Sequence, residues 1–236
     1  MKLKWRLSLL FIISILALLT FWNYQNRVYD WDMPGYMGCM YTSEFPDSPD
    51  KVRIITYEEI KKEAPAEHYT DIIGIKQWDI PRQYFVKNTQ SFTEQLPYFQ
   101  IKVGYILVIT LFYKLGFTAP MAVLFTSLIS YFFSGLLLFY ILKLLFPKKY
   151  WLAVVLTVAA MLLPPMTYMS RVSTPDMFIF QFMLIFIIGL LKKWSKWAMF
   201  VLLFGITFIR PDYITFTLTY IIAVFFFHYF ILSKGQ

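Results

Sequence analysis

The residue types that build disulfides and metal centres are scarce in this 236-residue sequence. Its single cysteine, Cys39, excludes a disulfide within the chain, and neither a CxxC nor an HExxH motif occurs. The two histidines, His68 and His228, lie far apart and are interpreted as a loop residue and a helix-end residue. The spacing therefore identifies no cofactor and no metal ligands. Binding of a divalent ion by acidic side chains remains an alternative.

Charged residues are also scarce, at 15% of the chain against about 25% in average proteins. Hydrophobic residues make up 58% and aromatic residues 21%, so this is an integral membrane protein whose first partner is the lipid bilayer. The net charge of +8 does not indicate a nucleic-acid partner. Residues 24–100 are net acidic, and the basic residues elsewhere form short clusters between apolar stretches, as membrane topology requires.

Acidic residues are almost absent from the second half of the chain. After residue 100 only Asp176 and Asp212 occur, and each follows a proline inside an apolar run. The remaining twelve lie between Asp30 and Glu94. Because an ionisable side chain near lipid is costly, these positions are the first candidates for function.

The apolar segments predict an all-α, polytopic transmembrane helix bundle of about six spans, forming one domain over residues 1–236. Residues 1–22 read as a retained signal anchor, since a basic flank precedes an apolar run without a cleavage site. By the positive-inside rule the N-terminus is cytoplasmic and residues 23–118 form a long extracytoplasmic loop, in the cell (inner) membrane. Residues 119–236 hold the other spans, expected at 120–146, 150–169 with a bend at Pro164 and Pro165, 174–191, 197–209 and 213–232.

Two helices are expected inside the long loop. Thr56 and Glu59 form a capping-box pattern that predicts a helix over residues 57–64, ended by Pro65. A second helix is expected over residues 97–115. Too few apolar residues separate its lysines for it to cross a bilayer, so it is predicted to be juxtamembrane or re-entrant.

The predicted topology brings six charged residues to the same outer interface. Such convergence is what an active site at the membrane surface needs, because its substrates arrive from outside while a lipid tail stays in the bilayer. The six are Asp30, Asp32, Arg171, Asp176, Arg210 and Asp212.

The first motif, YDWDMPGYMG, directly follows the first span. A carboxylate at this depth can accept a proton from an incoming hydroxyl or amine, so Asp32 is the first choice for a general base and Asp30 the second. Tyr36 is placed to orient a phosphate or a sugar. The alternative is an aromatic interface belt of Trp31, Tyr36 and Tyr41 beside a solvated acid.

The second motif is MSRVSTPDMF, between the third and fourth spans. Ser173 or Thr174 can cap the following helix, Pro175 suits its first turn and Asp176 complements its dipole, so capping alone explains most of the motif. Arg171 is harder to explain by capping, because a guanidinium at headgroup depth binds phosphate in a bidentate way.

The third motif, ITFIRPDYI, repeats this pattern with Pro211 and Asp212 opening a helix. Arg210 is free to bind an anionic group, and an Arg210–Asp212 ion pair is the alternative. In a compact bundle the two Pro-Asp turns become neighbours, at the rim of a lipid-phosphate site.

The order of these features resembles the glycosyltransferase C superfamily, in particular the branch with protein O-mannosyltransferases and lipid A aminoarabinose transferases. Residues 95–149 are similar to the family's juxtamembrane helix, its Tyr-Lys-Leu-Gly turn and its second span. SRVSTPDMF resembles the family's Arg-x-x-x-(Thr)-x-Asp turn, and IRPDY resembles an Arg-Pro-(Asp/Glu) turn found in many members.

The resemblance implies a glycosyltransferase that moves a sugar from a polyprenyl-phosphate donor to an extracytoplasmic acceptor. It implies Asp32 as the base, with Asp30 as the second choice, Asp176 as a second carboxylate, and Arg171 or Arg210 at the donor phosphate. The mannosyltransferase branch has a paired Asp-Glu where this chain has Asp30-Trp31-Asp32, and family members generally have more spans. A minimal enzyme, half of an assembly with a second membrane subunit, and an inactive relative therefore stay open. A non-catalytic scaffold or accessory subunit of cell-surface glycan assembly is the alternative function.

Overall fold

The computed structural model describes residues 2–227 and 229, and over these residues the regular structure is helical without a strand. The prediction of an all-α fold is confirmed. His228 and most of residues 228–232, the end of the expected last span, lie outside the described residues.

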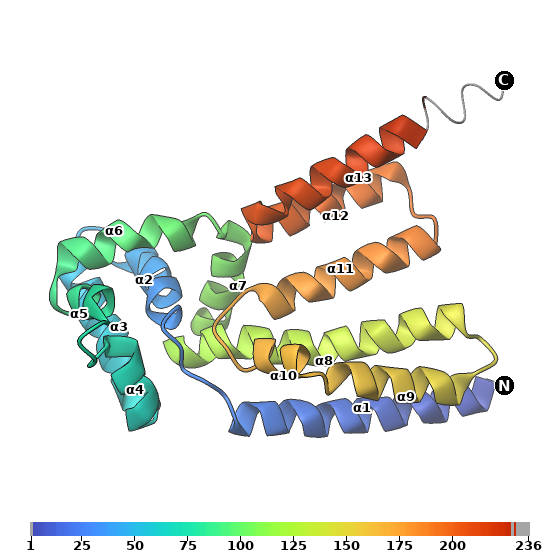
Figure 1. Cartoon of the computed structure of the whole chain (residues 1–236), viewed down its shortest axis with the longest axis horizontal. Coiled ribbons are helices and arrows are strands. Elements are labelled where there is room, and N and C mark those ends of the chain that lie inside the picture. Colours follow the sequence, from blue (N-terminus) through green and yellow to red (C-terminus); the bar gives the residue numbers. More distant parts are fainter. Residues whose placement is uncertain (1, 228, 230–236) are drawn as a thin grey trace.

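A set of elongated helices forms a bundle with α8 at its centre (Figure 1). The buried face of α8 packs against α1 on one side and α11 on the other, and α9 packs against both α1 and α8. Next to α11 follow α12, a short 3₁₀ turn at Pro211–Tyr213, and α13. The bundle helices are α1 (Lys2–Gln25), α8 (Ala119–Leu145), α9 (Tyr150–Met161), α11 (Asp176–Leu191), α12 (Lys196–Ile209) and α13 (Ile214–Phe226).

Two of these helices, α1 and α8, are long and apolar enough to cross a membrane. The helices α6 (Thr89–Gln100) and α7 (Val103–Lys114) would add a third crossing if they formed one broken span. The remaining apolar helices α9, α11, α12 and α13 have 12, 16, 14 and 13 residues. A crossing takes about 20 residues. The number of spans, predicted as six, is therefore not tested by these helix lengths.

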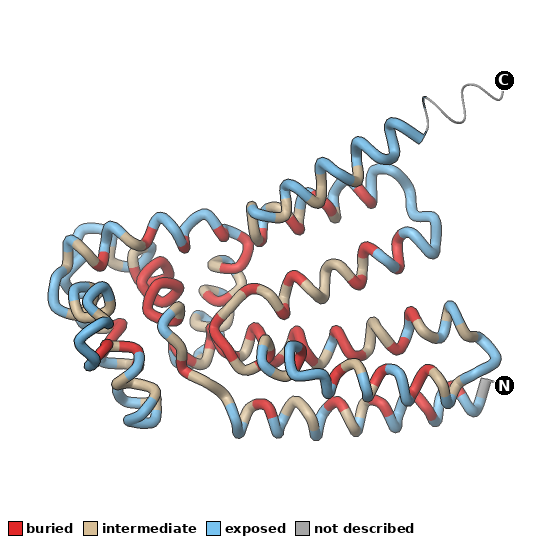
Figure 2. The backbone as a smooth tube through the Cα atoms, in the orientation of Figure 1, coloured by how far each residue is buried: buried red, intermediate tan, exposed pale blue. Residues whose placement is uncertain are grey.

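Between α1 and α7 the chain folds into a helical cap at one end of the bundle (Figure 1). Its centre is α2, whose residues from Met33 to Tyr41 are all buried (Figure 2). Tyr36 and Tyr41 therefore belong to the core, and the alternative that placed them in an exposed aromatic belt is wrong for both. The cap consists of α2 (Met33–Glu44), α3 (Pro49–Glu63), α4 (Ala66–Ile73), α5 (Ile80–Lys87) and α6.

The capping box expected at Thr56 is wrong. The helix α3 already begins at Pro49, so Thr56 lies in its interior with a buried hydroxyl that has no partner among the described residues. The Glu59 carboxylate instead accepts a hydrogen bond of 2.5 Å from the Tyr41 hydroxyl. Packing of α3 on α2 thus outweighs the local capping signal. The predicted end before Pro65 is confirmed, because α3 ends at Glu63.

The single helix expected over residues 97–115 is also wrong. The chain turns by 108° between α6 and α7, at Ile101 and Lys102, while Pro97 lies inside α6. By contrast, the break expected at Pro164 is confirmed, since α9 ends at Met161 and a separate α10 (Pro164–Met169) follows.

Candidate functional site

The link after α1 is fastened to the turn before α11. The Val28 backbone N–H donates to the Arg171 carbonyl at 2.9 Å, and the Ser173 N–H donates to Oδ2 of Asp30 at 2.6 Å. Oδ1 of Asp30 accepts from the Asp32 N–H at 3.0 Å. Burial raises the pKa of Asp30 to about 6, although these N–H groups oppose the rise. Asp30 thus joins two turns that are distant in the sequence.

Asp32 stands at the N-terminus of α2, where its carbonyl accepts hydrogen bonds from the Gly35 and Tyr36 N–H groups. Its half-buried carboxylate faces a cavity and has no hydrogen-bond partner among the described residues. Burial raises the pKa of Asp32, and the charge of Lys102 opposes that rise. A carboxylate with a raised pKa and open access is a stronger base than a solvated one.

The cavity has a volume of about 470 Å³ and lies between the cap and the ends of the bundle helices. Asp32 and Asp176, far apart in the sequence, both line it. Acids, cations and aromatic rings share its wall, so the cavity combines charged groups with an apolar surface. The lining consists of Trp31, Asp32, Tyr36, Phe85, Glu94, Gln95, Tyr98, Phe99, Lys102, Thr174, Pro175, Asp176 and Arg210.

Lys102 supplies one cation, and sequence reasoning missed it as a site residue. Its ammonium donates to the Tyr36 hydroxyl at 3.0 Å and lies 4.8 Å from the centroid of the Tyr98 ring. Tyr36 is fixed by edge-to-face contacts with Phe99 and Tyr105. In the sequence this lysine stands beside aromatic residues at the start of an apolar run. It was interpreted only as one boundary of that apolar run.

Arg210 supplies the second cation and links the two Pro-Asp turns. Its guanidinium pairs with Asp176 and, at 3.2 Å, with Asp212. The prediction that these turns are neighbours is confirmed, and so is the alternative of an Arg210–Asp212 ion pair, which means that Arg210 is not free. Asp212 is exposed and does not line the cavity. Its ion pair with Arg210 therefore lies outside the cavity.

Arg171 lies apart from the cavity. Its Nε donates to Oδ1 of Asn23 at 3.0 Å, and its guanidinium stacks 4.1 Å from the centroid of the Trp22 ring. These contacts attach the start of the turn to the end of α1. The carboxylate five residues along, Asp176, pairs with Arg210 instead.

The caps expected for the helix after this turn are wrong. The helix α11 begins at Asp176, and no side chain caps it. Pro175 precedes the first helical residue instead of lying in the first turn. The buried hydroxyls of Ser173 and Thr174 have no hydrogen-bond partner among the described residues. The reason is that the Ser173 backbone is held by Asp30, which fixes the turn in place of a cap.

Over residues 2–227 and 229, no group of three or more His, Cys, Asp or Glu side chains is arranged to hold a metal ion. Comparison of the chain with protein-family models, curated proteins and solved structures gave no match. The chemistry of the cavity therefore rests on its own residues. These are a carboxylate without a partner, two cations and a wall of aromatic rings.

Proposed function

We propose that this chain is a multi-pass membrane glycosyltransferase that transfers a sugar from a polyprenyl-phosphate donor to an extracytoplasmic acceptor. One observation carries the proposal: Asp32 and Asp176 line a single cavity with Lys102 and Arg210, beside apolar helices. A lipid-linked sugar phosphate needs a charged site next to a hydrophobic path, and this cavity offers both.

In the proposed reaction the acceptor hydroxyl attacks the anomeric carbon of the sugar. The bond from that carbon to the phosphate oxygen breaks, and the lipid phosphate leaves with the electron pair. Asp32 takes the proton of the hydroxyl as general base. Lys102 and Arg210 stabilise the charge that the leaving phosphate gains, and the rings of Tyr98 and Phe99 offer a surface for the sugar.

Six crossings with the N-terminus in the cytoplasm form part of the proposal. In Figure 1 the start of α1 and the turns after α8 and α11 lie at one end of the bundle, and the cap lies at the other. The first end carries the lysine clusters at 148–149 and 192–193. By the positive-inside rule these clusters support an orientation in a cell (inner) membrane with this end on the cytoplasmic side and the cavity outside.

The test replaces Asp32 by Asn in the full-length chain and follows sugar transfer in membranes from polyprenyl phosphates carrying mannose, glucose or aminoarabinose. Loss of the base is expected to lower kcat by about 10²- to 10⁴-fold. Asp47→Asn is the matched control, because Asp47 is an exposed acid in the turn after α2. Full turnover by the Asp32→Asn protein would eliminate this residue as the base.

A second arm of the same assay measures donor affinity. Lys102→Met removes one cation and is expected to raise KM for the donor on the order of 10- to 100-fold, as for a hydrogen bond between charged groups. Lys114→Met, at the exposed far end of α7, is its control and is expected to leave KM unchanged. If wild-type membranes transfer none of the sugars, the scaffold alternative gains support.

A further inference from the structure

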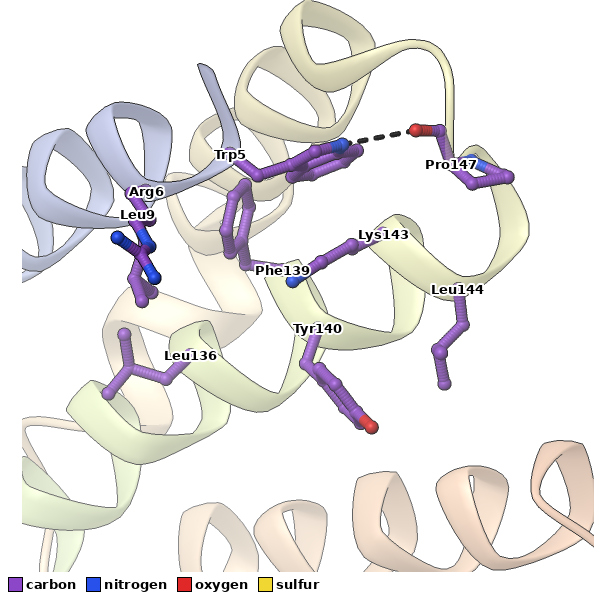
Figure 3. A pocket seen from close by; sticks show the side chains of 9 residues that line it. All are labelled: Trp5, Arg6, Leu9, Leu136, Phe139, Tyr140, Lys143, Leu144 and Pro147. Atoms are coloured by element: carbon purple, nitrogen blue, oxygen red, sulfur yellow. Dashed lines mark hydrogen bonds between the residues drawn. The ribbon is translucent and has the colours of Figure 1, made fainter. Parts of the chain in front are cut away.

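A second concave site lies at the opposite end of the bundle, in a groove between α1 and α8 (Figure 3). Its volume is about 500 Å³. The groove begins beside the first turns of α1 and ends under the turn that joins α8 to α9. It shares no residue with the cavity of Asp32.

The wall of this groove is mostly apolar, and contacts between α1 and the end of α8 form it. The indole N–H of Trp5 donates to the Pro147 carbonyl at 3.0 Å, which fastens the start of α1 to the turn after α8. The Trp5 ring packs against Phe139 with centroids 5.7 Å apart. Leu9 and Leu136 continue the apolar surface along the two helices. A surface of this kind fits a hydrocarbon chain.

Cations surround the same groove. Arg6 and Lys143 are exposed and line it, and Figure 3 draws the Phe139 ring between their charged ends. The ammonium of Lys192, from the turn after α11, lies 5.7 Å from the centroid of the Tyr140 ring, which also lines the groove.

No acid compensates this charge locally. The sequence contains no Asp or Glu before Asp30, and none between Glu94 and Asp176. Arg6 and Lys143 form no ion pair with any described residue. An anion from outside the chain would therefore balance the positive charge at this end of the bundle.

We infer that the groove binds an anionic phospholipid. Its phosphodiester would be held by the charges of Arg6 and Lys143 at the polar edge of the groove, and an acyl chain would cover Leu9, Leu136 and Phe139. A free phosphate satisfies the cations but leaves the apolar wall uncovered, and a zwitterionic lipid covers the wall but offers no net charge.

The test adds dioleoyl phosphatidylglycerol or dioleoyl phosphatidylcholine to the full-length chain purified in detergent and counts bound lipids by native mass spectrometry. Attraction of about fivefold per basic side chain predicts retention of phosphatidylglycerol at markedly lower concentration than phosphatidylcholine. The double variant Arg6→Gln/Lys143→Gln is expected to lose this preference. The matched control Lys148→Gln/Lys149→Gln removes two charges from the same end but outside the groove, and is expected to keep it.

Equal losses in both double variants would overturn the proposal, since they would mean a diffuse attraction to the basic end. Displacement of phosphatidylglycerol by an equal concentration of inorganic phosphate would also overturn it in favour of a phosphate site. Leu9→Trp tests the apolar half, because Leu9 is 41% exposed and a larger side chain there fills the groove without entering the core. Retention of phosphatidylglycerol by this variant at the wild-type level would place the lipid elsewhere.

Discussion

Asp30 and Asp32 are close neighbours in the sequence, but their carboxylates meet different surroundings. Asp30 is engaged by the N–H groups of Asp32 and Ser173, whereas the Asp32 carboxylate is open to the cavity. A base must have a free lone pair for the incoming proton. This difference ranks Asp32 ahead of Asp30 as the base of the proposed reaction, and it gives Asp30 a part in joining the two turns.

The raised pKa of Asp30 leads to a prediction about stability and pH. Its pKa lies near 3.8 in an unfolded chain and at about 6 in the folded one. The folded state therefore binds the proton more tightly, so the contribution of this group to stability falls as pH rises from about 4 to about 6. We expect the midpoint of thermal unfolding of the wild type, relative to Asp30→Asn, to decrease over this interval and to level off above it.

The comparison of the two proteins is made in detergent at each pH, so that other titrating groups cancel. Asp47→Asn serves as a control, because Asp47 is exposed and its replacement should leave the pH dependence of the wild type unchanged. A difference between wild type and Asp30→Asn that increases with pH in this interval would contradict the burial of Asp30.

Side-chain chemistry was easier to predict from the sequence than side-chain partners. Scarcity alone singled out Asp176 and Asp212, and both pair with Arg210 at the end of the bundle that holds the cavity. Pairing depends on contacts across long sequence separations, so the sequence did not reveal that Arg210 binds Asp176, or that Lys102 enters the cavity. Arg171, chosen because a guanidinium at headgroup depth can bind phosphate, packs on Trp22 instead.

Among the elements, α2 is the most tightly enclosed, and one glycine shows why. A Cβ on Gly35 would stand 2.3 Å from the Phe99 ring, closer than atoms can approach. The absence of a side chain there lets α6 lie directly on α2. The same ring of Phe99 forms part of the cavity wall, so packing of the cap and shape of the cavity are coupled.

Gly35→Ala is therefore expected to destabilise the protein. Forcing a methyl group against an enclosed ring costs about 1–3 kcal/mol. Gly205→Ala in α12 is the matched control, because no atom lies within 4 Å of the added Cβ and alanine favours a helix by about 0.5–1 kcal/mol. Thermal unfolding should show a lower midpoint for the first variant and an equal or higher one for the second. The reverse order would contradict the close packing of α6 on α2.

Helices that arise from long apolar runs were predicted well, and those of the cap were not. The run at residues 120–146 matches α8 closely, because bilayer-like apolarity specifies a helix without help from neighbours. In the cap, α3 begins eight residues before the expected helix over residues 57–64. Its start is set by Pro49 and by packing on α2, which a local capping pattern does not report.

At the scale of the whole molecule, charge is sorted between the two ends of the bundle. The cap holds most of the acids, and the opposite end holds lysines and the groove of Arg6 and Lys143. Such sorting is typical of a chain with one fixed orientation across a membrane. The proposed orientation can therefore be tested by labelling one residue at each end of the bundle.

Single cysteines test this orientation with an impermeant maleimide. The native Cys39 is only 3% exposed, so the wild type should remain unlabelled. Asp47→Cys, in the turn after α2, is expected to react in intact cells. Lys149→Cys, in the turn after α8, is expected to react only once the membrane is opened. Labelling of the second variant alone in intact cells would reverse the orientation.

The bond between Asp30 and Ser173 also bears on how the protein is made. It joins residues separated by 143 positions, and the cavity needs Arg210 still later in the chain. At about 5–20 residues/s, a ribosome takes roughly 10–40 s to pass from Asp32 to Arg210. For roughly 7–30 s of that interval, until Ser173 is made, the link after α1 has no turn to bind. A nascent chain halted before Ser173 should therefore expose the link after α1 to proteases and depend on chaperones, and only the later helices end that dependence.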